Sequence, residues 1–185
     1  MTQLPFSSSR IEKFMTQTFA RLAALPLFLC CTTVMAADKH AAHSHGAGNL
    51  ELVVQGTSVK ASFKIPMESL LGFEHLPRTP AQKKAMADLQ SAVAQASYFI
   101  TLPAAADCQP KSLQVNADMF KGKKSEHSDL DAEIEFSCSQ PNALKQLEIP
   151  LFKKHPRLGS LKVDMLSPKG QASVTLKAKD PVLRW

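Results

Sequence analysis

The segment Val59-Lys-Ala-Ser-Phe-Lys-Ile65 alternates apolar with polar side chains from end to end. Successive side chains of a β-strand point to opposite faces of a sheet, so this period of two predicts a strand with one buried and one solvated face. Gln55-Gly-Thr57 precedes it and predicts a tight turn from a second strand, Leu50-Glu-Leu-Val-Val54. The sequence therefore predicts an antiparallel hairpin with one apolar face.

The same alternation recurs along the rest of the chain. Its apolar positions are Leu113/Val115/Ala117, Leu130/Ala132/Ile134/Phe136, Leu161/Val163/Met165 and Ala172/Val174/Leu176. Ser167-Pro-Lys-Gly170 predicts a turn between the last two of these strands. The segment from Asp118 to Glu126, which contains Lys-Gly-Lys-Lys, is expected to be an exposed loop.

One segment departs from this period and predicts a helix. Thr79 is suited to the N-cap, Pro80 to the first helical position, and Gln82 to a capping box. Apolar residues follow at helical spacing and predict a helix of roughly four to five turns; they are Ala85, Met86, Leu89, Ala92, Val93 and Ala96. We expect an α+β fold of roughly seven or eight mostly antiparallel strands, with one main amphipathic helix packed on the apolar face of the sheet.

The first 36 residues have the pattern of a secretory signal peptide. Arg10, Lys13 and Arg21 precede an apolar run, and small residues follow up to Ala36. The run has roughly half of the ~20 residues that a membrane-spanning helix needs, so a retained anchor is the weaker interpretation. We expect residues 1–36 to be cleaved, residues 37–48 to form a histidine-containing arm, and residues 49–185 to form a single domain that is not inserted in the membrane.

The charge and the cysteines of the chain argue against several classes of function. The net charge is +6 for the whole chain, and the lysines occur in short pairs without interleaved aromatic residues, so we expect no nucleic-acid partner. After export, Cys108 and Cys138 would remain in an oxidising compartment, where a disulfide is expected and a metal-binding thiolate pair is the alternative. The sequence has no glycine-rich phosphate loop, nucleophile elbow or CxxC motif, and we expect no catalysis.

The remaining candidate functional residues are histidines. His40, His43 and His45 lie within the expected arm. In an extended chain, residues two apart project to the same side, so His43 and His45 can bind one ion together, although a polar terminus without a ligand is the alternative. Among the other histidines, His155 precedes Pro156 and is expected at a surface turn.

Two histidines of the domain have acidic neighbours. His75 directly follows Glu74, and an extended backbone would point these two side chains in opposite directions. His127 begins a strand whose outward positions are acidic: Asp129, Asp131, Glu133 and Glu135. Such an alternation is usually a solvated face, but it also attracts cations, and a histidine at its rim can coordinate them.

Several motifs lie along the mature chain. The most specific is Gly-Phe-Glu-His-x-Pro within Leu70–Thr79, and the others are His43-Ser-His45-Gly46, the two cysteines, Leu151-Phe-Lys-Lys-His-Pro156 and Ser167-Pro-Lys-Gly-Gln171. Together these motifs resemble the ZrgA-like family of periplasmic zinc-uptake proteins over essentially the whole mature chain. The resemblance implies a bacterial periplasmic protein that binds zinc and serves its acquisition without catalysis. An envelope zinc-transport system is then a candidate partner.

The chain departs from this family in one loop. Many members carry a long run of alternating histidine and acidic residues before the strand at His127, whereas this chain has only Asp118-Met-Phe-Lys-Gly-Lys-Lys-Ser-Glu-His127. Loading of several ions by that loop is therefore not expected. The site is expected to use imidazoles and water, with a carboxylate as a further ligand type; the ligands predicted are His43, His45, His75 and His127, with Glu74 as a ligand or its hydrogen-bond partner and His40 as an additional ligand.

Other functions remain open at this point. The chain can be a metal-independent structural or interaction domain of the envelope. It can also carry copper or nickel, because cleavage one residue later would give Asp38-Lys39-His40, whose third-position histidine suits square-planar ions. A metallohydrolase is less favoured, since no obvious general base accompanies the predicted ligands.

Overall fold

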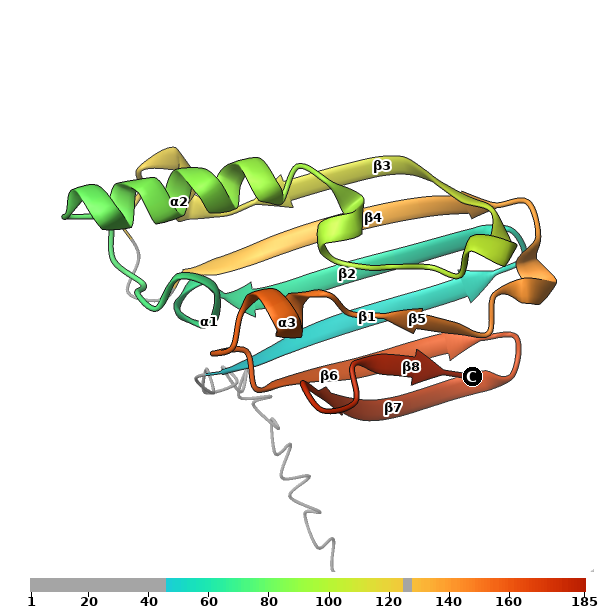
Figure 1. The fold of residues 1–185 in the computed structure, drawn as a ribbon. Helices are drawn as coiled ribbons and strands as arrows, with labels where there is room; N and C mark the ends of the chain where they lie inside the picture. The colour runs from blue at the N-terminus through green and yellow to red at the C-terminus, as the bar shows by residue number, and fades with distance from the viewer. Residues whose placement is uncertain (1–45, 125–127) are drawn as a thin grey trace, which may run out of the picture. The chain divides into compact units, whose positions relative to one another are not determined.

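The computed structural model describes residues 46–124 and 128–185, which belong to one compact unit. Its main feature is a six-stranded sheet with the order β3-β4-β2-β1-β6-β7 (Figure 1). The strands are β1 (Ala47–Gln55), β2 (Ser58–Pro66), β3 (Cys108–Asn116), β4 (Asp129–Cys138), β6 (Ser160–Ser167) and β7 (Gly170–Lys177). Neighbouring strands are antiparallel, except that β1 and β6 are parallel. The short strands β5 (Gln146–Glu148) and β8 (Val182–Arg184) pair separately.

The predicted hairpin forms the centre of this sheet. β1 and β2 pair from Asn49 opposite Lys64 to Gln55 opposite Ser58. Gly56 lies in the turn with a φ of 55°, in the left-handed region that favours glycine. The alternation within β2 places its apolar side chains, Val59, Ala61, Phe63 and Ile65, on the buried face. The predicted α+β class is therefore confirmed.

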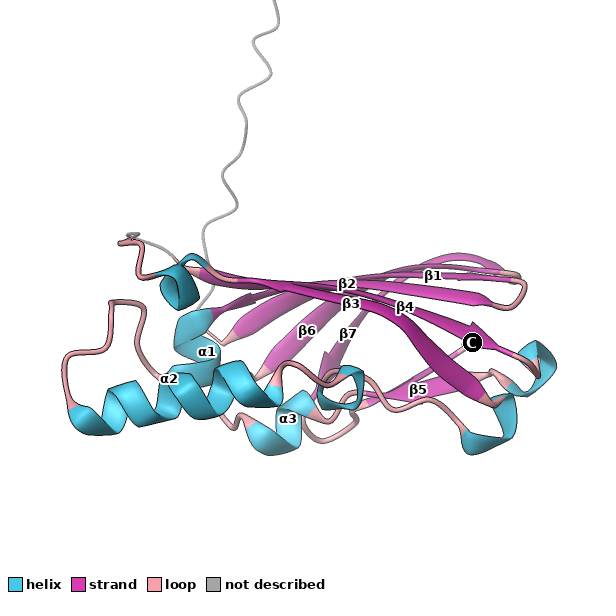
Figure 2. Cartoon of the chain, turned by 90° about the horizontal axis from the view of Figure 1, so that it is seen from above, coloured by secondary structure: helices cyan, strands magenta, loops and turns pink. Residues whose placement is uncertain are grey.

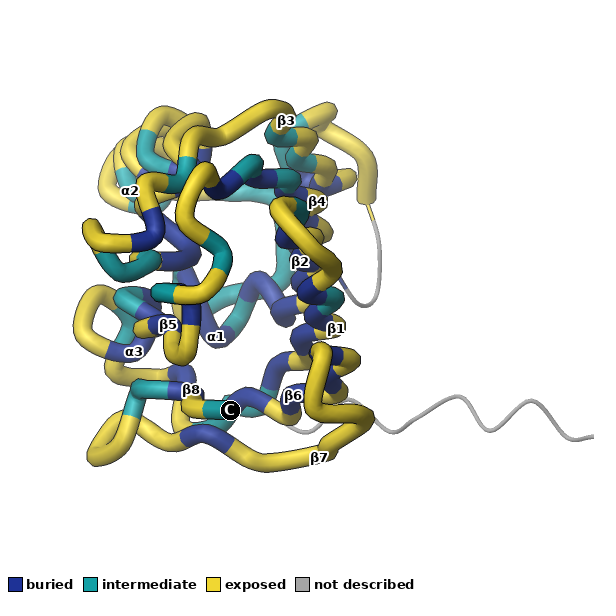
Figure 3. The backbone as a smooth tube through the Cα atoms, turned by 90° about the vertical axis from the view of Figure 1, so that its right-hand side faces the viewer, coloured by how far each residue is buried: buried dark blue, intermediate teal, exposed yellow. Residues whose placement is uncertain are grey.

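Among the described residues, three α-helices lie over one face of the sheet. The helices α1 (Met67–Leu71), α2 (Pro80–Ala92) and α3 (Leu151–Lys154) lie on the same side of it, together with β5 (Figure 2). Phe63 of β2 packs beneath this layer, with its ring centroid 5.4 Å from that of Phe99. No described helix covers the other face, and Figure 3 shows how buried and exposed positions alternate along the strands.

The predicted helix is confirmed at its start and is shorter than expected. Thr79 Oγ1 accepts a hydrogen bond from the Gln82 amide at 3.2 Å, and Gln82 Oε1 accepts one from the Thr79 amide at 3.3 Å. The helix ends at Ala92, and the expected continuation to Ala96 is wrong because Ala96 begins a 3-10 turn, η1 (Ala96–Tyr98). Tyr98, Phe99 and Ile100 are buried in succession. An α-helix would spread three adjacent side chains over roughly 200° around its axis, so this segment does not continue the α-helix.

The segment after β3 is only partly the exposed loop that was expected. Asp118–Lys121 forms the 3-10 helix η3, and the Met119 side chain within it is 2% exposed. A single buried side chain on a short turn has no periodicity by which the sequence could reveal it. The last residues of this predicted loop lie outside the described residues.

Cys108 and Cys138 form a disulfide, as predicted. They are cross-strand partners at one end of β3 and β4. The alternative of a metal-binding thiolate pair is therefore wrong. No helix within the described ranges is long and apolar enough to cross a membrane.

Candidate metal centre

The structure describes two of the predicted ligands, Glu74 and His75, in the connection between α1 and α2. Their side chains are partly buried. The remaining predicted ligands lie outside the described residues: His40, His43, His45 and His127. Within residues 46–124 and 128–185, no group of three or more His, Cys, Asp or Glu side chains is arranged to hold a metal ion. A site that uses Glu74 or His75 therefore needs donors from beyond these ranges.

The His75 ring is oriented by two neighbours. Its Nδ1 lies 2.9 Å from the carbonyl oxygen of Leu76. A carbonyl oxygen only accepts hydrogen bonds, so Nδ1 of His75 is the donor in this contact. The ring also stacks on Phe73, with centroids 5.5 Å apart. In the neutral ring this hydrogen bond leaves the lone pair on Nε2.

The end of α1 fixes where this connection begins. Gly72 has a φ of 82°, and its amide donates to the carbonyl oxygen of Glu68 at 2.7 Å. A Cβ at this position would lie 2.9 Å from Cζ of Arg157, so the guanidinium group packs directly against the glycine backbone. The left-handed conformation of Gly72 favours glycine there, whereas the Arg157 side chain near it is exposed and can move away.

The backbone of Gly46 contacts the turn His155–Gly159, which contains Arg157. Its carbonyl oxygen accepts hydrogen bonds from the amides of Gly159, at 2.7 Å, and Ser160, at 3.1 Å. Its φ is 79°, and a Cβ here would lie 2.9 Å from the carbonyl oxygen of Arg157. Gly46 directly follows His45 in the sequence. The base of the predicted arm and the start of the Glu74–His75 connection therefore meet at Arg157.

A third segment joins α1 from the start of β4. The amide of Met67 donates to the carbonyl oxygen of Ser128 at 2.8 Å. Ser128 directly follows His127 in the sequence. The hydroxyls of Ser69 and Ser128 are both buried and have no hydrogen-bond partner among the described residues. A buried hydroxyl without a hydrogen-bond partner is costly. The corner formed by α1, Gly46, Arg157 and Ser128 therefore contains two hydroxyl groups whose hydrogen bonds the described residues do not satisfy.

His155 lies inside this corner, and its expected place at a surface turn is wrong. Its Nδ1 lies 3.0 Å from the carbonyl oxygen of Leu70 in α1, and its Nε2 is hydrogen-bonded to the hydroxyl of Tyr98. Burial lowers the pKa of His155; the nearby charge of Lys154 lowers it further, and the hydrogen bond to Leu70 opposes both. Burial also raises the pKa of Tyr98 to about 12. Both ring nitrogens are engaged, so His155 supports α1 rather than binding a metal.

A comparison with known protein families identifies the family that the sequence motifs resemble. A family profile described as "ZrgA family zinc uptake protein" matches residues 42–185. The chain belongs to the ZrgA family. The match includes His43, His45, the corner around α1 and both cysteines. No curated protein matches the chain. The predicted resemblance is confirmed, and the family description associates the chain with zinc uptake.

The acidic side of β4 in this ZrgA family member is a solvated face with lysine counterions. Lys64 lies 3.5 Å from Asp129, and Lys60 lies 4.0 Å from Glu135. Burial raises the pKa of Asp131, with the neighbouring carboxylates adding to the rise and Lys64 opposing it. These contacts favour the solvated-face interpretation over coordination by the strand.

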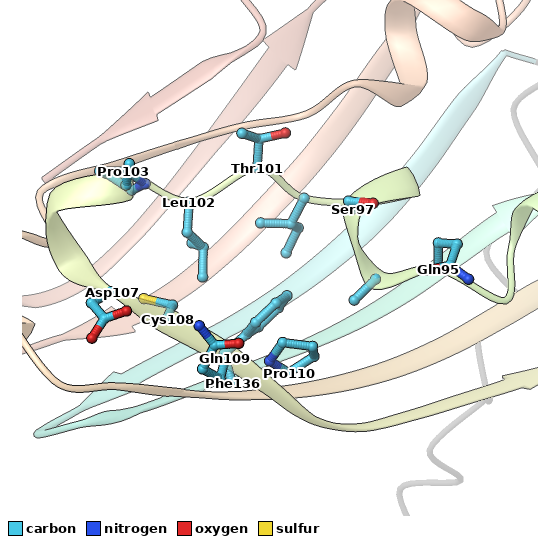
Figure 4. Close-up of a pocket in the computed structure, with 13 residues that line it drawn as sticks. Gln95, Ser97, Thr101, Leu102, Pro103, Asp107, Cys108, Gln109, Pro110 and Phe136 are labelled. Atoms are coloured by element: carbon cyan, nitrogen blue, oxygen red, sulfur yellow. The ribbon is translucent and has the colours of Figure 1, made fainter.

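A pocket of about 400 Å³ lies away from the corner, toward the disulfide end of β4. Leu102 extends from its loop toward Gln109 and Phe136 (Figure 4). Asp107 is at its edge, and the described residues that line it include no histidine. The pocket therefore does not provide the donor types predicted for zinc in this family member.

No sequence pattern indicated Arg157, Tyr98 or Ser69 as parts of the corner. Their contacts join positions far apart in the chain, and none of them belongs to a local pattern. The glycines at 46 and 72 were within reach of sequence analysis, because each adjoins a histidine motif.

Proposed function

We propose that this ZrgA family chain is an exported, periplasmic, non-catalytic protein that binds zinc and assists its acquisition or buffering. An envelope zinc-transport system is the proposed partner. The proposed donors come from the arm and from the domain: His43, His45, His75 and His127, with Glu74 and His40 as further candidates.

The observation that carries the proposal is the meeting of three segments around α1. Gly46 and Gly72 both pack against Arg157. The carbonyl oxygen of Ser128 accepts a hydrogen bond from the amide of Met67 at the start of α1. Each of these segments leads directly to a predicted ligand. Three residues of chain span at most about 11 Å, and three residues separate Gly46 from His43 and Gly72 from His75 in the sequence, which supports a shared site at this corner. The covalent chain therefore limits how far the proposed donors can be separated.

The donor chemistry is also appropriate for zinc. Zinc prefers four ligands, and neutral imidazoles are among its usual ones. The hydrogen bond of Nδ1 to Leu76 supports Nε2 as the donor atom of His75, and the hydroxyls of Ser69 and Ser128 can hydrogen-bond to donors or water at the corner. The family description independently associates the chain with zinc uptake.

Zinc titration of the mature protein tests the proposal. Native mass spectrometry gives the number of ions bound, and calorimetry compares the wild type with His43→Ala/His45→Ala, His75→Ala and His127→Ala. Each change should weaken binding, and combining an arm change with a domain change should cost less than the sum of the separate losses, because the donors share one ion. Glu133→Gln, on the exposed face of β4, is the matched control and should leave the affinity unchanged.

Three outcomes would contradict parts of this proposal. A wild-type protein that binds no zinc would remove it entirely. Loss of binding only in the arm variant would make the arm a self-sufficient chelator. Loss only in the domain variants would make the arm a polar terminus without a ligand.

A further inference from the structure

The two edge strands of the six-stranded sheet, β3 and β7, differ in how well they are protected against pairing with a further strand. β3 contains Pro110, which has no amide hydrogen, followed by Lys111 and a register shift. Proline, lysine and bulges are the usual means by which proteins protect a sheet edge. β7 lies at the opposite side of the sheet (Figure 1) and has no proline, and its register with β6 is continuous. β7 is therefore the less protected edge.

The backbone of β7 has hydrogen-bonding groups that face away from β6. The carbonyl oxygen of Lys177 accepts a hydrogen bond from the amide of Asp180 at 2.9 Å, on the side opposite to β6. Alternate residues of a strand direct their backbone groups to the same side, so Gln171, Ser173 and Thr175 also direct theirs away from β6. Within residues 46–124 and 128–185, these three residues have no backbone partner on that side.

Asp180 occupies the outer side of β7 at Lys177, so the free edge runs from Gly170 to Leu176. The free edge contains no charged residue, and only Leu176 within it is buried. Like charges directly opposite each other would oppose pairing, and the free edge has none to bring together. Its residues are mostly small or polar, and they allow a second strand to approach closely.

The free edge is also complementary to itself. In an antiparallel pair related by a two-fold axis, the residue on the axis lies opposite its own copy. Ser173 is the central residue of the free edge, so an axis at Ser173 lets the whole free edge pair. An axis at Val174 would instead need the place beside Lys177 that Asp180 occupies. The geometry therefore selects the register with Ser173 on the axis.

We propose that the free edge of β7 pairs with the same edge of a second copy of this chain, antiparallel and with Ser173 on the two-fold axis, so that the two sheets become continuous. Ser173 then exchanges backbone hydrogen bonds with its own copy, and Gln171 does so with Thr175. Val174, which is 39% exposed, packs against Ala172 of the second copy. Pairing through one strand buries a small area, so the dimer is weak and reversible.

Sedimentation equilibrium of the mature protein, measured over a range of concentrations with a metal chelator present, tests the proposal. The wild type should dimerise reversibly. Ser173→Lys places two ammonium groups together on the axis and should raise the dissociation constant at least about 10-fold. Ser62→Lys is the matched control, because Ser62 is also exposed and also lies opposite a carboxylate, Glu133, as Ser173 lies opposite Asp164. Its dissociation constant should equal that of the wild type.

A cross-linking experiment tests the register directly and needs only a small change of side chain. The Cα atoms of a hydrogen-bonded antiparallel pair are about 5.5 Å apart, which is within the range that a disulfide spans. Ser173→Cys should therefore form a covalent dimer when the protein is treated with oxidised glutathione. Ser62→Cys, at the centre of the sheet, should stay monomeric on a non-reducing gel.

Three results would overturn the proposal. The first is a wild type that stays monomeric at every concentration, which would leave the edge to a partner other than a second copy. The second is a dimer that Ser173→Lys weakens no more than Ser62→Lys does. The third is equal cross-linking of Ser173→Cys and Ser62→Cys. Should Ser173→Lys fail to fold, the cross-linking result alone decides. None of these measurements depends on zinc, so the proposed function is tested separately.

Discussion

Alanine substitutions at Gly46, Gly56 and Gly72 separate backbone strain from contact with Arg157. All three glycines have positive φ values, 79°, 55° and 82°. Alanine in the left-handed region costs about 1–2 kcal/mol. At Gly56 no atom lies within 4 Å of the added Cβ, so this strain is the whole cost there. Gly56→Ala is therefore the matched control for the other two.

The other two substitutions add different contacts. At Gly72 the new Cβ meets the far end of the Arg157 side chain, which is exposed and can move away, so the loss of stability should be close to that of Gly56→Ala. At Gly46 it meets the Arg157 carbonyl oxygen, which can yield only by disturbing the hydrogen bond from Gly159 to Gly46. That bond is worth about 1 kcal/mol, so Gly46→Ala should cost roughly 2–3 kcal/mol in total.

Urea and thermal unfolding measure this series, and zinc titration completes it. Each kcal/mol corresponds to roughly 2–4 °C in melting temperature for a domain of about this size, so Gly56→Ala and Gly72→Ala should each lower it by roughly 2–8 °C. Gly46→Ala should lower it further. Zinc affinity should fall in Gly72→Ala, because Gly72 begins the connection that carries Glu74 and His75, and stay unchanged in Gly56→Ala.

Two results would refute this reasoning. The first is a Gly46→Ala protein as stable as Gly56→Ala, because the backbone contact with Arg157 would then carry no cost. The second is an equal loss of zinc affinity in Gly56→Ala and Gly72→Ala, which would show that strain anywhere in the domain weakens the site.

Three further predictions concern the disulfide and pH. Breaking the bond between Cys108 and Cys138, which are 30 residues apart, should lower the free energy of unfolding by about 3–4 kcal/mol; urea unfolding with and without reductant checks this, with a double Cys→Ser variant as control, and an unchanged midpoint in the reduced protein contradicts it. Zinc affinity should fall steeply as the pH drops through about 6.5, since imidazoles must be neutral to bind zinc; constant affinity down to about pH 5 in calorimetry would make carboxylates the main ligands. The apo protein should lose stability as the pH falls below 6.5, the ordinary pKa of histidine, because the lowered pKa of His155 lets the unfolded state take up its proton first. This loss should level off below the folded-state pKa, and His155→Gln should reduce it; equal pH dependence of the urea midpoint in both proteins would contradict this.

Local patterns predicted most of the secondary structure. The strand at Val59–Ile65, the turn at Gly56 and the capping box at Thr79 each depend on neighbouring residues, and all are confirmed. The parallel pairing of β1 with β6 was not predicted, because register between distant strands leaves no local trace. The end of α2 was also missed, since it is set by burial of Tyr98–Ile100 rather than by a stop residue.

In the candidate site, too, the residues with local contacts were predicted and those with distant contacts were not. Motifs identified Glu74 and His75, and the contacts of the His75 ring with Leu76 and Phe73 are local. His155 was misplaced because its sequence neighbours, Lys153 and Lys154, are exposed, whereas its partner Tyr98 is 57 residues away. The complete ligand set and the proposed boundaries of signal, arm and domain stay predictions.

The parallel pairing of β1 with β6 also sets the order in which the molecule can assemble. β1 is the first strand of the chain, but one of its two neighbours in the sheet, β6, is synthesised near the end. Pairings between such distant segments form slowly, because a long loop must close before any contact is gained. Gly46 can meet Arg157 only after this pairing. If the arm and the domain share one zinc ion, as proposed above, they can do so only in chains whose synthesis and folding are essentially complete.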